Sequence, residues 1–170
     1  MYKADNVYMG VAKAHATLSK ATRLKVGACI VTPSRVIIPG VNGQPKPLGN
    51  VCEHGGVTKA SVIHAELNCI LKAQREGINI EGAALYVTHS PCEHCASLII
   101  ETGISRVVYA EEYRSLVGVE NLKMAGVIVE SEMTKPVDVE IWLEDRWLAE
   151  KGVGYPNVSV EQETEDESVG

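Results

Sequence analysis

A chain of 170 residues, 45% hydrophobic and 22% charged, is the size of one domain with a sizeable core, and two full domains are not expected. Apolar runs such as 27–31 fall far short of the ~18–20 residues that a membrane span needs, which excludes a transmembrane helix. The N-terminal residues have no apolar core followed by a cleavage site, so no secretory signal is predicted and a cytoplasmic location is expected.

The formal net charge of −6 is concentrated at the C-terminus. Residues 156–170 hold five acidic residues and no basic one, which leaves 16 basic and 17 acidic residues, a net charge of −1, in the first 155. A net charge this close to zero over residues 1–155 argues against binding a nucleic acid polymer, because polymer binding requires many contacts between basic side chains and phosphates. A single nucleotide needs only one or two cations and stays possible.

The cysteine content points to metal chemistry. Five cysteines in a chain without an export signal favour metal binding or buried thiols over a disulfide framework. The chain has no Phe, so any aromatic stacking on a ligand must come from Tyr, Trp or His.

The N-terminal part predicts a helix followed by a hairpin. Residues 5–20 show helical periodicity, with an apolar stripe predicted to face the core: Val7, Val11, Ala14 and Leu18. Short β-branched runs at 26–31 and 36–38, joined by a turn, predict two antiparallel strands. The segment 40–56 is rich in Gly and Pro and reads as a long loop, which in a compact domain is usually functional.

The middle of the chain predicts two helices that flank a strand. The second helix is expected over 61–75, with an apolar stripe at Ile63, Leu67, Ile70 and Leu71. A strand over 83–88 leads to a third helix over 91–102, for which Ser90 and Glu93 have the spacing of a capping box with Pro91 at the first helical position.

The remaining pattern completes an α/β domain. A strand at 107–110, a helix at 119–125 and a strand at 127–130 continue the alternation, which predicts a three-layer α/β/α sandwich around a mixed five-stranded sheet. A further helix is expected over 135–151, and disorder beyond 156. The predicted organisation is therefore one domain over 1–155 and an acidic tail over 156–170.

Two of the predicted helix starts carry metal-binding residue types. His64 lies near the start of the second helix, and Cys92 and Cys95 lie on one face at the start of the third, where the helix dipole favours thiolates. Catalytic zinc sites use three such N and S ligands and leave the fourth position open. Glu66, two residues from His64, is expected to shuttle protons rather than to bind as a fourth ligand.

Other cysteines and histidines have plainer interpretations. Cys29 and Cys69 fall within predicted elements and are expected to pack in the core. Cys52 and His54 resemble half of a second zinc site, but no further ligands accompany them, which favours loop packing or a nucleotide contact. His89 is either near the substrate or in a structural hydrogen bond.

The His-x-Glu and Pro-Cys-x-x-Cys pair is the general signature of zinc deaminases of nucleobases. Beyond the motifs, residues 8–129 resemble the deoxycytidylate (dCMP) deaminases of bacteriophage type, within the cytidine deaminase superfamily. The segments that carry the resemblance are 25–28, 40–43, 64–68, 81–88, 90–92 and 103–109.

The resemblance implies a cytidine deaminase-like fold that converts dCMP to dUMP and ammonia, supplying thymidylate synthesis. It implies one catalytic Zn²⁺ per chain and a homohexamer, activated by dCTP, with Mg²⁺ accompanying the triphosphate, and inhibited by dTTP. The location would be the host cytoplasm if the gene is carried by a phage.

The resemblance also suggests substrate contacts. Asn42 is expected to contact the sugar, and backbone groups at Ala65 and Ser90 to read the base. Tyr113 is a candidate to stack on the base or flank the sugar. The candidate phosphate ligands are Arg23, Lys25 and Arg114.

Alternative functions stay open at this point. A free cytidine or cytosine deaminase is the nearest, although such enzymes generally have Cys where this chain has His64. Another nucleobase deaminase is possible, but a tRNA or DNA editor is disfavoured by the near-neutral body. A non-catalytic, zinc-stabilised nucleotide-binding regulator would not need the carboxylate of Glu66.

Overall fold

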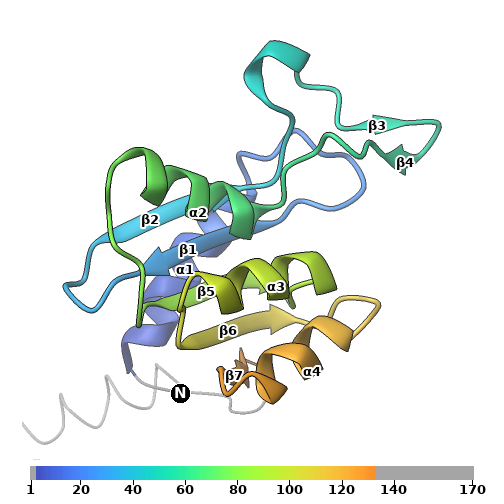
Figure 1. Ribbon diagram of the computed structural model, residues 1–170. Helices are drawn as coiled ribbons and strands as arrows, with labels where there is room; N and C mark the ends of the chain where they lie inside the picture. Colours follow the sequence, from blue (N-terminus) through green and yellow to red (C-terminus); the bar gives the residue numbers. More distant parts are fainter. Residues whose placement is uncertain (1–2, 133–170) are drawn as a thin grey trace, which may run out of the picture. The chain divides into compact units, whose positions relative to one another are not determined.

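A mixed five-stranded sheet forms the centre of the computed structural model, which describes residues 3–132 (Figure 1). The strand order is β2-β1-β5-β6-β7, with these bounds: β1 Gly27–Val31, β2 Ile37–Val41, β5 Ala84–His89, β6 Arg106–Glu111 and β7 Ile128–Ser131. β1 pairs antiparallel with β2 and with β5, whereas β5, β6 and β7 are parallel. The predicted sheet and its hairpin are confirmed.

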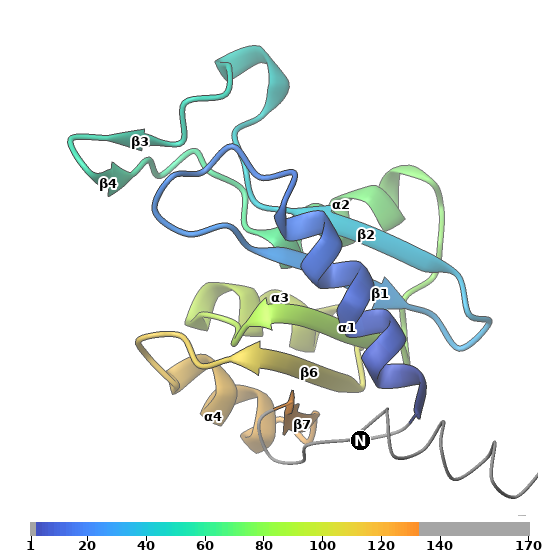
Figure 2. The same cartoon turned by 180° about the vertical axis from the view of Figure 1, so that it is seen from behind.

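Helices cover both faces of the sheet, as the α/β/α prediction requires. Helix α1 (Lys3–Ala16) lies on one face, and α2 (Ala65–Arg75), α3 (Glu93–Glu101) and α4 (Val117–Met124) lie on the other (Figures 1 and 2). Alternating strand residues supply the two cores. Ile30, Leu85 and Val107 face the three helices, and Cys29 and Val108 face α1. Gly40 lets α2 approach β2, because a Cβ there would lie 2.5 Å from Cys69 Sγ.

Strand directions bring the helix starts together. β2 and β5 are both antiparallel to β1, so β2, β5 and β6 end at the same edge of the sheet. The segments after these strands lead to α2, α3 and α4, respectively. In open α/β sheets, ligands bind outside the carboxyl ends of the strands, and this edge is therefore the expected place for a site.

The predicted core face of α1 is largely wrong, because only Val11 of its four residues packs, partly buried, against the core. Val7 and Leu18 are 64% and 61% exposed, and the helix ends at Ala16, whereas Asp5, Met9 and Ala12 are fully buried. The side that faces the sheet carries Asp5 as well as Met9 and Ala12. Arg106 on β6 forms a two-fold ion pair with Asp5, and Tyr86 donates its hydroxyl to the same carboxylate at 2.6 Å. A buried charge of this kind needs its partner, which apolar periodicity does not reveal.

Two further helix starts differ from the prediction. The second helix begins at Ala65 instead of 61, because Ile63 is tied to Gly43 in a β-bridge and His64 is an extended N-cap residue. Its buried residues are Ala65, Glu66, Cys69 and Ala73 instead of the predicted stripe, whose members are only partly buried.

The third helix begins at Glu93 with Cys92 as N-cap, and the predicted capping box does not form. The hydroxyl of Ser90 instead accepts the backbone N–H of Tyr113 at 2.8 Å. That contact comes from a segment 23 residues away.

The predicted loop has local structure of its own. Its first two residues end β2, and the rest contains a 3-10 turn, η1 (Lys46–Leu48), and β3 (Glu53–His54), which forms a small hairpin with β4 (Val57–Thr58) just beyond the predicted loop. The fourth helix and the last strand agree with prediction to within two residues.

The predicted helix over 135–151, the tail over 156–170 and the domain boundary between them lie outside the described residues. Among residues 3–132, no helix has the length and apolar character that crossing a membrane requires.

Candidate active site

Three side chains converge where α2 and α3 begin. His64 is the N-cap residue of α2, Cys92 is the N-cap residue of α3, and Cys95 lies in the first turn of α3. The Nδ1 atom of His64 is 3.5 Å from the Sγ atom of Cys92 and 3.5 Å from that of Cys95. Within residues 3–132 no other trio of His, Cys, Asp or Glu side chains is gathered closely enough to hold a metal ion, so Cys52 and His54 form no second site there.

The spacing of these three atoms fits zinc. A tetrahedral ion with Zn–N of about 2.0–2.1 Å and Zn–S of about 2.3 Å holds its nitrogen and sulfur ligands about 3.6 Å apart. The two observed N···S distances of 3.5 Å agree with that separation. The set of one imidazole and two thiols is also the donor chemistry that zinc prefers.

The electrostatics of the cluster favour one thiolate. The hydrogen bond from the Cys95 thiol, followed by that from His64, lowers the pKa of Cys92 to about 3. The bond with Cys92 raises the pKa of Cys95 in turn, and it also raises the pKa of His64. The lowered pKa of Cys92 favours its thiolate form, which is the form that binds a metal ion.

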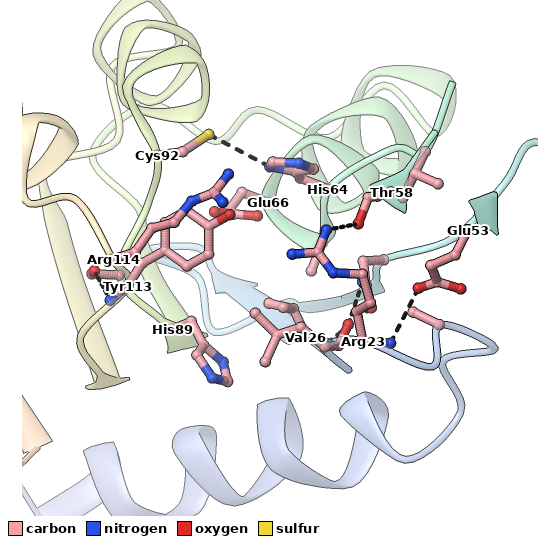
Figure 3. Close-up of a pocket in the computed structure, with 16 residues that line it drawn as sticks. Arg23, Val26, Glu53, Thr58, His64, Glu66, His89, Cys92, Tyr113 and Arg114 are labelled. Carbon is pink, nitrogen blue, oxygen red and sulfur yellow. Dashed lines mark hydrogen bonds between the residues drawn. The ribbon is translucent and has the colours of Figure 1, made fainter. Parts of the chain in front are cut away.

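Glu66 lies beside this cluster in the first turn of α2. Its side chain is 4% exposed, and burial raises the pKa of its carboxyl above the ordinary range for glutamate. It lines the same pocket as His64 and Cys92 (Figure 3). A buried carboxyl with a raised pKa holds a proton more readily than an exposed one, which suits general acid–base chemistry.

The pocket extends from the cluster to a pair of arginines. Tyr113 and Arg114 lie on one side and Arg23 on the other, as Figure 3 shows. The guanidinium of Arg114 lies 5.2 Å from the centre of the Tyr113 ring. The pocket thus offers a metal-binding end, an aromatic surface and two cations.

The structure brings together most of the residues that the sequence singled out. The predicted site residues that line the pocket are Arg23, Asn42, His64, Ala65, Glu66, Ser90, Cys92, Tyr113 and Arg114. Cys95 is not part of the lining but belongs to the metal-binding trio. Lys25 is exposed and is absent from the lining, so the structure does not bring it to the pocket.

Asn42 makes contacts that the sequence did not suggest. Its side-chain amide accepts the backbone N–H of Val26 and donates to the carbonyl oxygen of Leu24, both at 2.9 Å. An amide group has capacity for further hydrogen bonds beyond these two. Asn42 therefore also fixes the backbone segment that forms one wall of the pocket.

Sequence reasoning missed the residues that hold Arg23. The carboxylate of Glu53 accepts the backbone N–H groups of Thr22 and Arg23 at 3.1 and 3.2 Å. The guanidinium of Arg23 donates to the hydroxyl of Thr58 at 2.9 Å. Glu53 and Thr58 lie in the hairpin of β3 and β4, and no local sequence signal links that hairpin to residue 23.

His89 makes the structural contacts that one of its predicted interpretations required, and it also lies in the pocket lining. It lines the pocket, its Nδ1 atom lies 3.1 Å from the Thr88 hydroxyl, and its Nε2 atom lies 3.3 Å from the Glu111 carboxylate. Cys29, Cys69 and Cys52 are buried, which agrees with core and loop packing.

The site combines a metal-binding trio with a buried carboxylate, and helix starts at one edge of an α/β sandwich carry both. This combination defines the class of zinc-dependent nucleobase deaminases. A sequence model of the cytidine and deoxycytidylate deaminase zinc-binding region matches residues 2–111. The chain belongs to this cytidine and deoxycytidylate deaminase family.

Relatives and solved structures agree with this membership. The chain is 39% identical over 131 residues to ComE operon protein 2 of Bacillus subtilis, covering 74% of this chain and 69% of that protein. It is 37% identical over 123 residues to the deoxycytidylate deaminase of Mycobacterium phage D29, covering 64% and 94% respectively. The crystal structure of the dCMP deaminase from cyanophage S-TIM5, in complex with dCMP and dUMP, superposes with a TM-score of 0.74 at 36% identity, covering 77% of this chain and 98% of that one.

Thiol reactivity should separate the metal-binding cysteines from the core cysteines. Burial raises the pKa of Cys29 to about 12 and raises that of Cys69 as well, so neither should react at neutral pH, whereas Cys92 is partly exposed and ionised. After treatment with a chelator, we expect iodoacetamide to label Cys92 first, and added zinc to protect it. Peptide mass spectrometry measures the sites, and equally fast labelling of Cys29 would contradict the assignment.

Proposed function

We propose that this chain catalyses the hydrolytic deamination of dCMP to dUMP and ammonia. The observation that carries the proposal is the position of Glu66, a buried carboxyl beside a metal-binding trio in a pocket that also holds two arginines. The names of the phage D29 relative and of the cyanophage protein, which was solved with dCMP and dUMP, support the choice of substrate.

His64, Cys92 and Cys95 are the proposed zinc ligands. When bound, zinc lowers the pKa of a water molecule from 15.7 to about 7 and so supplies a nucleophile for C4 of cytosine at neutral pH. His64 and Cys92 both line the pocket, so an ion held by these residues would lie at its wall, where its bound water could meet a substrate.

Glu66 is the proposed general base and then the general acid. Its carboxylate accepts a proton from the attacking water and passes it to N3 of the cytosine ring. The carboxylate then takes the proton of the new C4 hydroxyl and delivers it to the amino group, the C4–N bond breaks, and ammonia leaves as C4 becomes the carbonyl of dUMP. Burial supports this role because it raises the pKa of the carboxyl towards the working pH.

The remaining pocket residues are proposed to hold the nucleotide. Backbone groups at Ala65 and Ser90 would read the base, and the side-chain amide of Asn42 would contact the sugar. Tyr113 would stack on the base or flank the sugar. Their shared position in the pocket lining supports these roles.

A substrate panel tests the proposal directly. The zinc-loaded full chain is incubated with dCMP, CMP, deoxycytidine, dCTP and guanine, while ultraviolet absorbance and released ammonia are followed. We expect the highest kcat/KM with dCMP. A preference for deoxycytidine would favour a free cytidine deaminase, and no ammonia from any substrate would leave only a non-catalytic, zinc-stabilised regulator.

The phosphate of dCMP should be recognised by Arg23 and Arg114. A charge-assisted hydrogen bond contributes ~1.5–3 kcal/mol, so we expect Arg23→Gln and Arg114→Gln each to lower kcat/KM for dCMP by roughly 10- to 150-fold. The rate with deoxycytidine, which has no phosphate, should change little. Lys25→Gln is the matched control, because Lys25 is exposed and outside the pocket lining. Equal losses with dCMP and deoxycytidine would contradict the phosphate role.

Regulation, assembly and location are proposed from the family resemblance alone. We expect activation by dCTP with Mg²⁺, inhibition by dTTP and assembly as a homohexamer. The expected location is the cytoplasm, which would be that of the host if a phage carries the gene. Titrating both triphosphates against the dCMP saturation curve tests the regulation, and light scattering measures the number of chains. A hyperbolic curve that neither nucleotide changes would remove the regulatory proposal.

A further inference from the structure

Gly118, the second residue of α4, lies directly against the backbone that carries Cys92. A Cβ atom at this position would lie 2.7 Å from the carbonyl carbon of Cys92, 2.9 Å from its carbonyl oxygen, and closer still to the carbonyl oxygen of Pro91. Contacts between such atoms are optimal at ~3.5–4.0 Å, so any side chain here would displace one backbone from the other.

Glycine is required at position 118 because there is no room for a side chain, and not because of its backbone conformation. Gly118 has no positive φ, so an L-residue could adopt its backbone conformation without strain. It is buried, and the atoms that a Cβ would meet are all backbone atoms, which cannot swing aside as the end of a long side chain can.

The turn before α3 has little freedom to absorb a displacement. Its Ser90 donates its backbone N–H to the Glu111 carbonyl oxygen at 2.8 Å, and the Ser90 hydroxyl accepts the N–H of Tyr113, also at 2.8 Å. The carbonyl oxygen of Cys92 accepts the N–H of Ala96 at 2.9 Å. Residues of β6, of the segment that follows it and of α4 therefore hold the Cys92 turn, and the carbonyl oxygen of Cys92 is also fixed within α3.

We propose that Gly118 is a positioning residue for metal binding, since its lack of a side chain lets the Cys92 turn lie where the Cys92 thiol meets His64. This proposal rests on the assignment of His64, Cys92 and Cys95 as metal ligands. The N···S distance of 3.5 Å between His64 and Cys92 already fits zinc. A shift of a few tenths of an ångström in the Cys92 backbone would therefore take the Cys92 thiol out of the distance range that zinc coordination needs.

The test compares three glycine-to-alanine variants of the full chain. Gly118→Ala introduces the clash at the Cys92 turn. Gly27→Ala introduces an equally close backbone clash, with Ala12 and Ala16 of α1, on the opposite face of the sheet. Gly10→Ala adds a methyl group with no atom within 4 Å. Zinc affinity is measured by competition with a chromophoric chelator, and Co²⁺ in place of zinc reports thiolate coordination by its absorption spectrum.

We expect Gly118→Ala to lower zinc affinity by about 10- to 100-fold, the size seen when groups that orient metal ligands are changed, and to alter the Co²⁺ spectrum. Gly27→Ala should lower the unfolding temperature of the metal-free chain while zinc affinity and the Co²⁺ spectrum stay unchanged. Gly10→Ala should leave zinc affinity and the Co²⁺ spectrum unchanged and should not lower the unfolding temperature, because alanine favours the helix at this position in α1.

Two results would overturn the proposal. One is a Gly118→Ala chain with unchanged zinc affinity and Co²⁺ spectrum. The other is a Gly118→Ala chain that is unfolded by circular dichroism while Gly27→Ala stays folded, because Gly118 would then serve the whole fold. Failure of the unaltered chain to bind either metal is a different result, and it would overturn the ligand assignment under the proposed function.

Discussion

Replacing Glu66 with glutamine is expected to abolish most turnover of dCMP while the chain keeps about one zinc ion. The amide is nearly the same size as the carboxyl but cannot accept and return protons. General acid–base catalysis contributes about 10²- to 10⁴-fold, and we expect a loss of kcat towards the upper end because Glu66 handles the proton in successive steps. Steady-state kinetics and zinc analysis on the same preparation measure both effects.

The stability of the metal-free variant serves as the control. Burial raises the pKa of the Glu66 carboxyl because the ionised form is poorly solvated there. Glutamine removes that cost, so the unfolding temperature of metal-free Glu66→Gln at neutral pH should equal or exceed that of the unaltered chain. A variant that loses its zinc together with its activity would show instead that Glu66 is a ligand.

Replacing Cys92 with serine is expected to remove the zinc and the activity together. A serine hydroxyl stays protonated at neutral pH and is a poor zinc ligand, whereas the Cys92 thiol ionises readily, with a pKa lowered to about 3. The loss of zinc affinity should exceed the roughly 10- to 100-fold typical of residues that only orient ligands. Metal analysis after dialysis at a fixed free zinc concentration measures it.

Cys52→Ser is the matched control for this change. The Cys52 thiol is buried and lies 3.7 Å from the Asn50 carbonyl oxygen, to which a serine hydroxyl can also donate. We expect Cys52→Ser to keep about one zinc ion per chain and full activity. Retention of zinc and activity by Cys92→Ser would refute the proposed ligand set.

The metal-binding trio could be predicted from the sequence because its elements are local. His64 with Glu66, and Cys92 with Cys95, are each spaced within one helical turn and lie at the start of a helix. The order of strands and helices also predicts a mixed sheet. Its parallel strands must be joined by helical crossovers, because parallel neighbours cannot be linked by a tight turn. These inferences need only the chain's local spacing, and the structure agrees with both.

The face of α1 could not be predicted, because the helix carries two candidate faces. Periodicity identified the more apolar one, with Val7 and Leu18, which lies largely exposed. The buried face contains Asp5, and its burial depends on Arg106, which is 101 residues away. Periodicity ranks residues by hydrophobicity and does not account for a distant partner that compensates a buried charge.

By itself, the sequence of this protein determined the chemical identity of the site: a histidine, two thiols and a carboxylate, each presented by a helix start. Only the tertiary structure decided which cations share the pocket with these groups, since Arg23 and Arg114 line it while Lys25 does not. It also decided what holds the site in place, namely Glu53 and Thr58 behind Arg23, and Gly118 against Cys92. The physical reason is that ligand type and helical spacing are short-range properties, whereas the approach of one backbone to another depends on packing across the whole sheet.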